Sequence, residues 1–334
     1  MNNTGFEKIS VNYEWGTLRE VVVGCPNARI GTKPPEFLNF DLPDGVIEWI
    51  KDITEKFPGR KMKEIMPEMH EQMKEQIDAV VSLLENRGIK VHRVPELEPE
   101  EELFPIPGVD FYTQMFPRDV MLVIGEKFIE NAPYYPMRRR EKLAVRRLLK
   151  SRLENHMIVS MPEPLPVWKE NCDLPFGEQA FLEGGDVLLF GKDILVGNSG
   201  NASSVQGINW LRKFLGNEYN VQEVKIRGGF LHLDCALCVP KPGFAMICRE
   251  AFVDGIPDLI KDWELLDVSF DDAKNKLGCN GLILDQKNII ISAELPHIGE
   301  KLDKAGFNVI TTPFSIVYIF GGALRCWHHP LIRE

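Results

Sequence analysis

Apolar residues along the chain fall into short runs bounded by turn residues, which is the pattern of β-strands. The first run is a single predicted strand, and each of the four later regions reads as strand, turn and strand. The turns carry glycine, proline or aspartate, and the runs beside them carry β-branched and aromatic residues, so we predict four β-hairpins. The five regions cover residues 18–26, 118–133, 185–200, 233–250 and 281–294.

A helical spacing of apolar residues replaces the strand pattern between most of these regions. Residues 69–88 repeat apolar side chains every three or four positions and end at Gly88, a residue type that commonly terminates helices. The stretch 138–155 also carries many arginines, which we interpret as a solvated helix face that balances the acidic remainder. We predict helices within residues 69–88, 138–155, 203–216 and 293–306.

The order of these elements indicates a repeat. The last three hairpins begin at residues 185, 233 and 281, a spacing of roughly 48 residues that is typical of propellers and other repeat arrays. The repeating unit is ββαβ, because a helix and a further strand follow each hairpin. No Pro/Ser-rich linker divides the chain, and the most loop-like stretch is the acidic, proline-rich segment 95–108. We therefore predict one catalytic domain over residues 1–334, an α/β fold arranged as a closed ring of ββαβ blades.

Composition narrows the class of partner. The 334 residues are 44% hydrophobic and carry a net charge of -10, which argues against nucleic acid or an anionic membrane as the main partner. This acidic balance is compatible with a small cationic substrate. The sequence has no run of 18 apolar residues and no targeting signal, and its seven scattered cysteines are expected to be reduced thiols. We therefore expect a cytoplasmic protein.

Ionisable residues recur where the predicted hairpins begin and where the chain ends. Equivalent strand ends in a ring of blades converge near its axis, so these side chains are expected to share a central pocket. They are Arg118 and Asp119 in "FPRD", Glu183 and Asp186 in "EGGD", His232 and Asp234 in "HLD", and Cys326 in "GGALRC".

These residue types suit the chemistry of a guanidinium group. A thiolate attacks an electrophilic carbon, carboxylates hold a planar cation by paired hydrogen bonds, and a histidine moves the protons of the leaving and entering groups. The central carbon of a guanidinium is unreactive because its charge is delocalised. Attack therefore needs carboxylates that hold the group and a histidine that protonates the leaving nitrogen. The alternative is a non-catalytic binding module in which Cys326 is only a buried core residue.

Five motifs in order resemble the guanidino-group-modifying enzymes of the α/β-propeller (pentein) fold. This superfamily includes arginine deiminases, dimethylarginine hydrolases and amidinotransferases. The motifs are "YEWGTLREVVVG", "FPRDVMLVIG", "EGGDVLLFG", "HLD" and "GGALRC", and they span nearly the whole chain. The resemblance implies a pseudo-fivefold ring of blades. The chemistry implies no cofactor, whether metal, nucleotide or flavin.

The resemblance also implies roles for individual residues. Cys326 is expected to be the nucleophile that forms an amidino-cysteine intermediate, His232 the general acid/base, and Asp186 the catalytic carboxylate. Amidinotransferases that use amino acids carry an arginine for the α-carboxylate some way after "HLD", and Arg249 lies near that place. The expected substrate-binding residues are Asp119, Asp234, Arg118, Glu183 and Arg249.

Within the superfamily, the amidinotransferase branch is favoured. Residues 207–212, "GINWLR", and the "RCW" near the C-terminus resemble that branch, whereas "LEGGDVL" is closer to the hydrolases. The expected activity is transfer of the amidino group of arginine to an acceptor amine, and a guanidino hydrolase with the same site is the alternative. The expected partners are a small guanidino donor and an amine acceptor, without nucleic acid or membrane. The acceptor remains unspecified, and a homodimer remains open.

Overall fold

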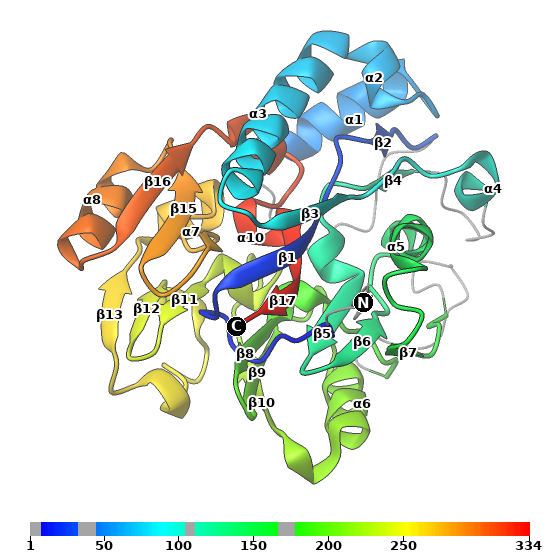
Figure 1. Ribbon diagram of the computed structural model, residues 1–334. Coiled ribbons are helices and arrows are strands. Elements are labelled where there is room, and N and C mark those ends of the chain that lie inside the picture. The colour runs from blue at the N-terminus through cyan, green and yellow to red at the C-terminus, as the bar shows by residue number, and fades with distance from the viewer. Residues whose placement is uncertain (1–7, 33–44, 104–110, 166–177) are drawn as a thin grey trace, which may run out of the picture.

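The computed structural model in Figure 1 describes residues 8–32, 45–103, 111–165 and 178–334. Strands within these ranges form five three-stranded sheets and one two-stranded ribbon. Each three-stranded sheet has one antiparallel pair and one parallel pair. This mixed arrangement arises because a tight turn joins antiparallel neighbours, whereas a parallel neighbour needs a crossover.

Four of the sheets are built from consecutive segments of the chain. A hairpin supplies the first two strands, and the third strand returns parallel to the second after a crossover. The strands are β5 (Met121–Ile124), β6 (Lys127–Glu130) and β7 (Met157–Ser160); β8 (Val187–Phe190), β9 (Asp193–Asn198) and β10 (Asn220–Lys225); β11 (Leu237–Lys241), β12 (Phe244–Ile247) and β13 (Glu264–Asp267); and β14 (Leu282–Ile283), β15 (Asn288–Ser292) and β16 (Asn308–Thr312).

The fifth sheet joins the two ends of the chain. Its central strand β1 (Leu18–Val23) is antiparallel to the C-terminal strand β17 (His328–Arg333) and parallel to β3 (Lys90–Arg93). The crossover from β1 to β3 is the longest of the five, and its helices lie together at the top of Figure 1. These helices are α1 (Val46–Lys56), α2 (Met62–Ile65) and α3 (Pro67–Glu85).

The predicted hairpins and helices are confirmed, mostly with shorter boundaries, and α3 begins two residues before its predicted stretch, at Pro67. Helices α3, α5, α6 and α8 occupy the four stretches that apolar periodicity predicted, and the four predicted hairpins are the first two strands of the consecutive sheets. The remaining elements are α5 (Glu141–Leu149), α6 (Val205–Leu215), α7 (Phe270–Lys276), α8 (Pro296–Lys304), α9 (Ser315–Tyr318) and α10 (Leu324–Trp327), with β2 (Ala28–Arg29) paired to β4 (Tyr112–Thr113).

Three segments differ from the expectation. The crossover from β12 to β13 carries the short 3-10 turns η6 (Arg249–Ala251) and η7 (Asp258–Ile260) in place of the expected α-helix. Residues 95–108 were expected to form a loop, but Glu98 and Glu101 form a capping box that starts the one-turn helix α4 (Pro99–Glu102); residues 104–108 lie outside the described part of the chain. Helix α1 was not predicted, although its apolar residues recur at positions 46, 49, 50 and 53, the spacing of one helix face.

Short helical turns at the start of four sheets bring distant segments together. The one-turn helices η1 (Pro117–Asp119), η3 (Gly184–Asp186) and η5 (Leu233–Cys235) precede β5, β8 and β11, and α10 precedes β17. Turn η3 contacts both η1 and η5, and α10 contacts η1. The predicted motifs lie on these turns or beside them, so their side chains meet despite long separations in sequence. No helix in the described ranges is both long and apolar enough to cross a membrane.

Trp327, at the end of α10, anchors the C-terminal strand in the core. Its side chain is fully buried, its Nε1 donates a hydrogen bond to the carbonyl oxygen of Gly24 over 3.1 Å, and its ring meets that of Phe314 edge to face. Because large buried aromatic rings leave a cavity when truncated, we expect Trp327→Ala to lower the free energy of unfolding by about 3–5 kcal/mol.

Urea denaturation followed by circular dichroism will measure this loss. Met157→Ala is the matched control, because the Met157 side chain lies exposed on the edge strand β7. Equal unfolding free energies for the two variants would contradict the anchoring role of Trp327.

Candidate active site

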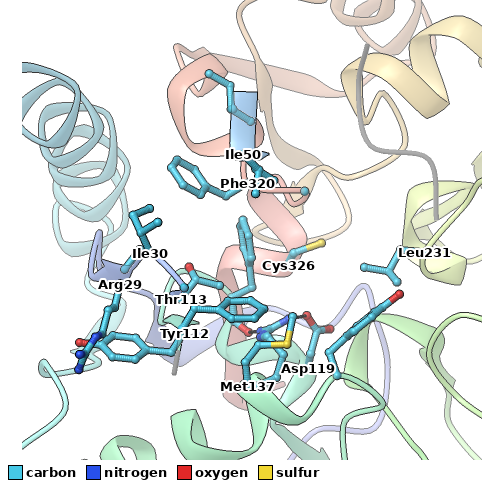
Figure 2. A pocket seen from close by; sticks show the side chains of 18 of the residues that line it. Arg29, Ile30, Ile50, Tyr112, Thr113, Asp119, Met137, Leu231, Phe320 and Cys326 are labelled. Carbon is cyan, nitrogen blue, oxygen red and sulfur yellow. Dashed lines mark hydrogen bonds and ion pairs between the residues drawn. The ribbon is translucent and has the colours of Figure 1, made fainter. Parts of the chain in front are cut away.

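One cavity of about 160 Å³ brings together half of the predicted site residues (Figure 2). Four of the eight candidates line it: Asp119 from η1, Glu183 before η3, His232 before η5 and Cys326 from α10. All four side chains are buried. The ends of four different sheets therefore supply one thiol, one imidazole and two carboxylates to the same space.

His232 is held between two carboxylates. Its Nε2 lies 2.8 Å from Oε2 of Glu183, and its Nδ1 lies 3.8 Å from Oδ1 of Asp119. Burial would lower the pKa of His232, but the charges of Asp119, Glu183 and Asp186 outweigh it and raise the pKa to about 10. The ring is therefore an imidazolium at neutral pH, and it can donate a proton to a leaving amine.

The glycine pair of "EGGD" makes room for this imidazole. A Cβ atom added to Gly185 would lie 2.6 Å from His232 Nδ1, closer than real Cβ contacts allow. The backbone N–H of Gly185 also donates a hydrogen bond to Asp119 Oδ1 over 3.1 Å. A side chain at this position would thus displace the histidine, so glycine is required by close approach.

Arg138 is a site residue that the sequence interpretation missed. Its guanidinium donates to Asp119 Oδ2 over 3.2 Å and pairs with Glu141, and it lines the cavity. Arg138, Arg139 and Arg140 are all buried, so the prediction of a solvated basic face is wrong for this end of the stretch. These arginines hold buried carboxylates and backbone carbonyls instead of facing solvent.

Cys326 is buried and has a polar partner on either side. Asn280 Nδ2 donates a hydrogen bond to its Sγ over 3.2 Å, and the thiol points to Oδ2 of Asp234 at 3.6 Å. Burial raises the pKa of the Cys326 thiol well above its usual range, and the charges of Asp234 and Asp119 raise it further. The resting group is therefore a thiol, and a cation placed beside these carboxylates would favour the thiolate.

Asp234 and Arg118 lie behind the cavity wall. Asp234 accepts a hydrogen bond from the Arg325 guanidinium over 2.9 Å, and Arg118 donates to the carbonyl oxygen of Arg325 over 3.1 Å. Burial, with the charge of Arg325, lowers the pKa of Arg118 to about 9. Neither residue lines the cavity, although Asp234 still touches the sulfur of Cys326.

The structure places Asp186 and Arg249 away from the cavity. Both carboxylate oxygens of Asp186 accept backbone N–H groups, from Leu233 over 3.0 Å and from Ser203 over 3.2 Å. Burial raises the pKa of Asp186 to about 7. Arg249 is a half-exposed surface residue paired with Asp267. We therefore replace Asp186 with Glu183 as the carboxylate that contacts His232, and we leave Arg249 out of the site.

Asp119, Glu183 and His232 also have the spacing of metal ligands. Their ligand atoms lie within 4.8 Å of one another. The shortest contact in the group is the 2.8 Å hydrogen bond from His232 to Glu183, which a metal ion on the same nitrogen would break. We therefore interpret the group as a proton-transfer cluster.

Comparison with known proteins places the fold in a family. Residues 49–249, more than half of the chain, match the sequence model of the arginine deiminase family. The chain is 25% identical to an L-arginine:L-lysine amidinotransferase from Pseudomonas savastanoi pv. phaseolicola, over 94% of this chain and 91% of that protein.

Two solved structures share the fold to different degrees. An inosamine-phosphate amidinotransferase from Streptomyces griseus superposes with a TM-score of 0.83 at 21% identity, over 98% of this chain and 97% of that one. A dimethylarginine dimethylaminohydrolase from Pseudomonas aeruginosa superposes with a TM-score of 0.64 at 14% identity, over 94% of this chain and 99% of that one.

The raised pKa of His232 predicts a pH dependence of stability. An imidazole in the unfolded chain has a pKa of about 6.5, so the stabilisation from the charged ring is complete below that pH. It is lost as the pH rises through the folded-state pKa of about 10. We expect the unfolding free energy of the wild-type protein to fall between about pH 7 and pH 9. The fall should be less steep in His232→Gln. The two slopes should differ by up to about 1.4 kcal/mol per pH unit, the limit for one proton.

Urea denaturation of both proteins at several pH values across this range will measure the two slopes. Identical slopes would show that His232 is neutral in the folded protein.

Proposed function

The chain belongs to the arginine deiminase family, and from this premise we propose that it is an amidinotransferase that carries the amidino group of arginine on Cys326. The observation that supports this most strongly is the shared cavity of Cys326, His232, Glu183 and Asp119. Two amidinotransferases support transfer over hydrolysis: one is 25% identical to the chain over 94% of its length, and the other superposes with a TM-score of 0.83, against 0.64 for the hydrolase.

The first half-reaction begins with binding of the donor. The guanidinium of arginine binds beside Asp119 and Glu183, where its charge offsets the carboxylates that keep the Cys326 thiol protonated. The Cys326 thiol then releases its proton to solvent, and the resulting thiolate attacks the central carbon and forms a C–S bond. The bond from this carbon to the ornithine nitrogen then breaks, and the His232 imidazolium gives its proton to the leaving amine.

The second half-reaction reverses these roles. His232 is now neutral and takes a proton from the acceptor amine, whose nitrogen attacks the amidino carbon. The C–S bond breaks, and its electron pair returns to the sulfur of Cys326. Asp119 and Glu183 hold the planar group throughout, while Asp234 and Asp186 position the turns from which Cys326 and His232 extend.

The site is consistent with a propeller, which we propose as the arrangement of the five sheets. Four sheets share one order of strands, and the fifth takes its outer antiparallel strand from the other end of the chain. The turns that begin β5, β8, β11 and β17 contact one another. A ring of blades closed by β17 would account for both features.

Arg29 is the candidate partner for the α-carboxylate of arginine. It lines the cavity, and its Nη1 lies 3.5 Å from Glu102, a loose contact for an ion pair. Glu102 is also bound by Lys61 over 2.6 Å and by the hydroxyl of Tyr112 over 2.9 Å. Glu102 keeps these two partners, and Arg29 Nε is held by the carbonyl oxygen of Gly59 over 3.1 Å, so the Nη atoms of Arg29 are the donors for a substrate carboxylate.

We expect Cys326→Ala and Cys326→Ser to lose exchange of labelled ornithine into arginine by at least about 1,000-fold, because this exchange needs only the first half-reaction and its covalent intermediate. Mass spectrometry of arginine after incubation with heavy ornithine will measure it. Circular dichroism will check folding.

Cys238→Ala is the control, since Cys238 is an equally buried thiol in β11 that does not line the cavity. Exchange that survives in Cys326→Ala would rule out the covalent route. Steady formation of citrulline without any amine, together with no label exchange, would favour the hydrolase.

A second variant tests the donor site. Arg29→Gln should lower kcat/KM for arginine at least about tenfold, the worth of one hydrogen bond to a charged group, and should change kcat/KM for agmatine less than about threefold. Agmatine is the suitable comparison because it is arginine without the carboxylate. Equal losses with the two donors would show that Arg29 does not contact the carboxylate.

A further inference from the structure

The cavity has an apolar wall that faces the reacting groups. Helix α1 lines the cavity with Trp49, Ile50 and Ile53, and Phe320 lines it from the segment that leads to α10. The rings of Trp49 and Phe320 meet edge to face with centroids 6.0 Å apart. Figure 2 shows Ile50 and Phe320 next to each other on the side of Cys326 opposite to Asp119. We refer to these four residues as the apolar wall.

The apolar wall lies between the core and the cavity: Trp49 and Phe320 pack against a buried core cluster, and both also line the cavity. Trp49, Ile50 and Phe320 are only partly buried, although the opposite face of α1 carries exposed charged residues. Helix α1 therefore directs its apolar face toward a cavity that a ligand can enter. Partly exposed apolar surface of this kind is stabilised when an apolar ligand removes it from water.

Arginine and ornithine do not match this wall. The end of each molecule that lies away from the reacting nitrogen carries an ammonium group and a carboxylate, which are costly to bury against apolar side chains without partners. The Lys and Arg residues that line the cavity within the described ranges are Arg29 and Arg138. Arg138 is bound to Asp119 and Glu141, and Figure 2 shows Arg29 well apart from Ile50 and Phe320.

We infer that the apolar wall binds the body of the acceptor, which is a primary amine with an aliphatic chain or aromatic ring and no carboxylate. This inference rests on the proposed function. The amine nitrogen forms a bond to the amidino carbon, the C–S bond to Cys326 breaks with its electron pair returning to sulfur, and the amine proton passes to His232. An apolar body against α1 also excludes water, which would otherwise hydrolyse the intermediate.

Matched amines test the inference on the wild-type enzyme and on Arg29→Gln. With arginine as donor, kcat/KM should rise about fourfold for each methylene along butylamine, pentylamine and hexylamine, the effect of burying one methylene group. 6-Aminohexanoate is hexylamine with a carboxylate in place of the terminal methyl group. It is compared with hexylamine in Arg29→Gln, because Arg29 is the candidate partner of a substrate carboxylate, and there its kcat/KM should be at least about tenfold lower. Mass spectrometry of the guanidino products gives both values.

Substitutions in the apolar wall test whether its residues cause the preference for apolar amines. In Ile50→Thr and in Phe320→Ala, the ratio of hexylamine transfer to ornithine–arginine label exchange should fall at least about threefold, because only the acceptor loses apolar contact. Ile50→Thr keeps the β-branched shape, removes the terminal methyl group and replaces a methylene group with a hydroxyl group, so it tests the wall even if Phe320→Ala does not fold. Glu55→Ala is the matched control on the exposed face of α1, and it should leave the ratio unchanged.

A further substitution is expected to shift the preference of the enzyme from hexylamine toward 6-aminohexanoate. Ile50→Arg places a cation on the wall, so it should raise transfer to 6-aminohexanoate relative to hexylamine. The inference is overturned if 6-aminohexanoate matches or exceeds hexylamine in Arg29→Gln, or if the ratio does not respond to Ile50→Thr, while label exchange continues. Loss of label exchange in the wild-type enzyme would instead overturn the proposed function itself.

Discussion

The buried guanidinium of Arg325 is the contact on which the arrangement of the site depends. It donates two hydrogen bonds to the carboxylate of Glu14, one to Asp234 over 2.9 Å and one to the carbonyl oxygen of Val187 over 2.9 Å. These partners come from the N-terminal segment, η5 and β8. A buried cation must be fully paired, and its planar donors then fix the geometry of each partner. Since Cys326 is the next residue, the same bonds that satisfy Arg325 also position the thiol.

The carboxylates around the cavity each serve two groups. Asp234 binds Arg325 on one side and meets the Cys326 thiol on the other, and Asp119 binds Arg138 while it faces His232. The arginines keep these carboxylates ordered, and their remaining negative charge keeps protons on the sulfur and the imidazole. The empty site therefore holds its protons until a cation arrives, which couples reactivity to binding of a guanidinium.

The cavity combines two parts that the chain builds separately. Its polar side comes from turns that begin the sheets, and these turns are constrained by pairing with the strands that follow. Three residues of its apolar wall come from α1 in the long crossover between β1 and β3, and Phe320 comes from the segment before α10. The reacting groups and the proposed acceptor surface therefore lie on different elements of the chain, and the names of two relatives specify different acceptors.

Local pattern was sufficient for the secondary structure and for much of the site. Strand and helix periodicity with turn residues identified the hairpins and four helices, because these signals depend on neighbours a few positions apart. The short motifs also identified Asp119, Glu183, His232 and Cys326, which the structure brings together. Each lies beside a strand start, and this regular placement is what made their convergence predictable.

Only the tertiary structure decided which groups face the cavity. The two carboxylates of "EGGD" are three positions apart, and contacts with η5 turn Glu183 toward His232 while Asp186 binds backbone amides. Asn280 lies 46 residues before Cys326, so nothing local links it to the sulfur that it contacts. Arg138 looked like surface charge because the sequence shows its charge but not its buried partners. Such roles depend on long-range packing, which residue spacing does not contain.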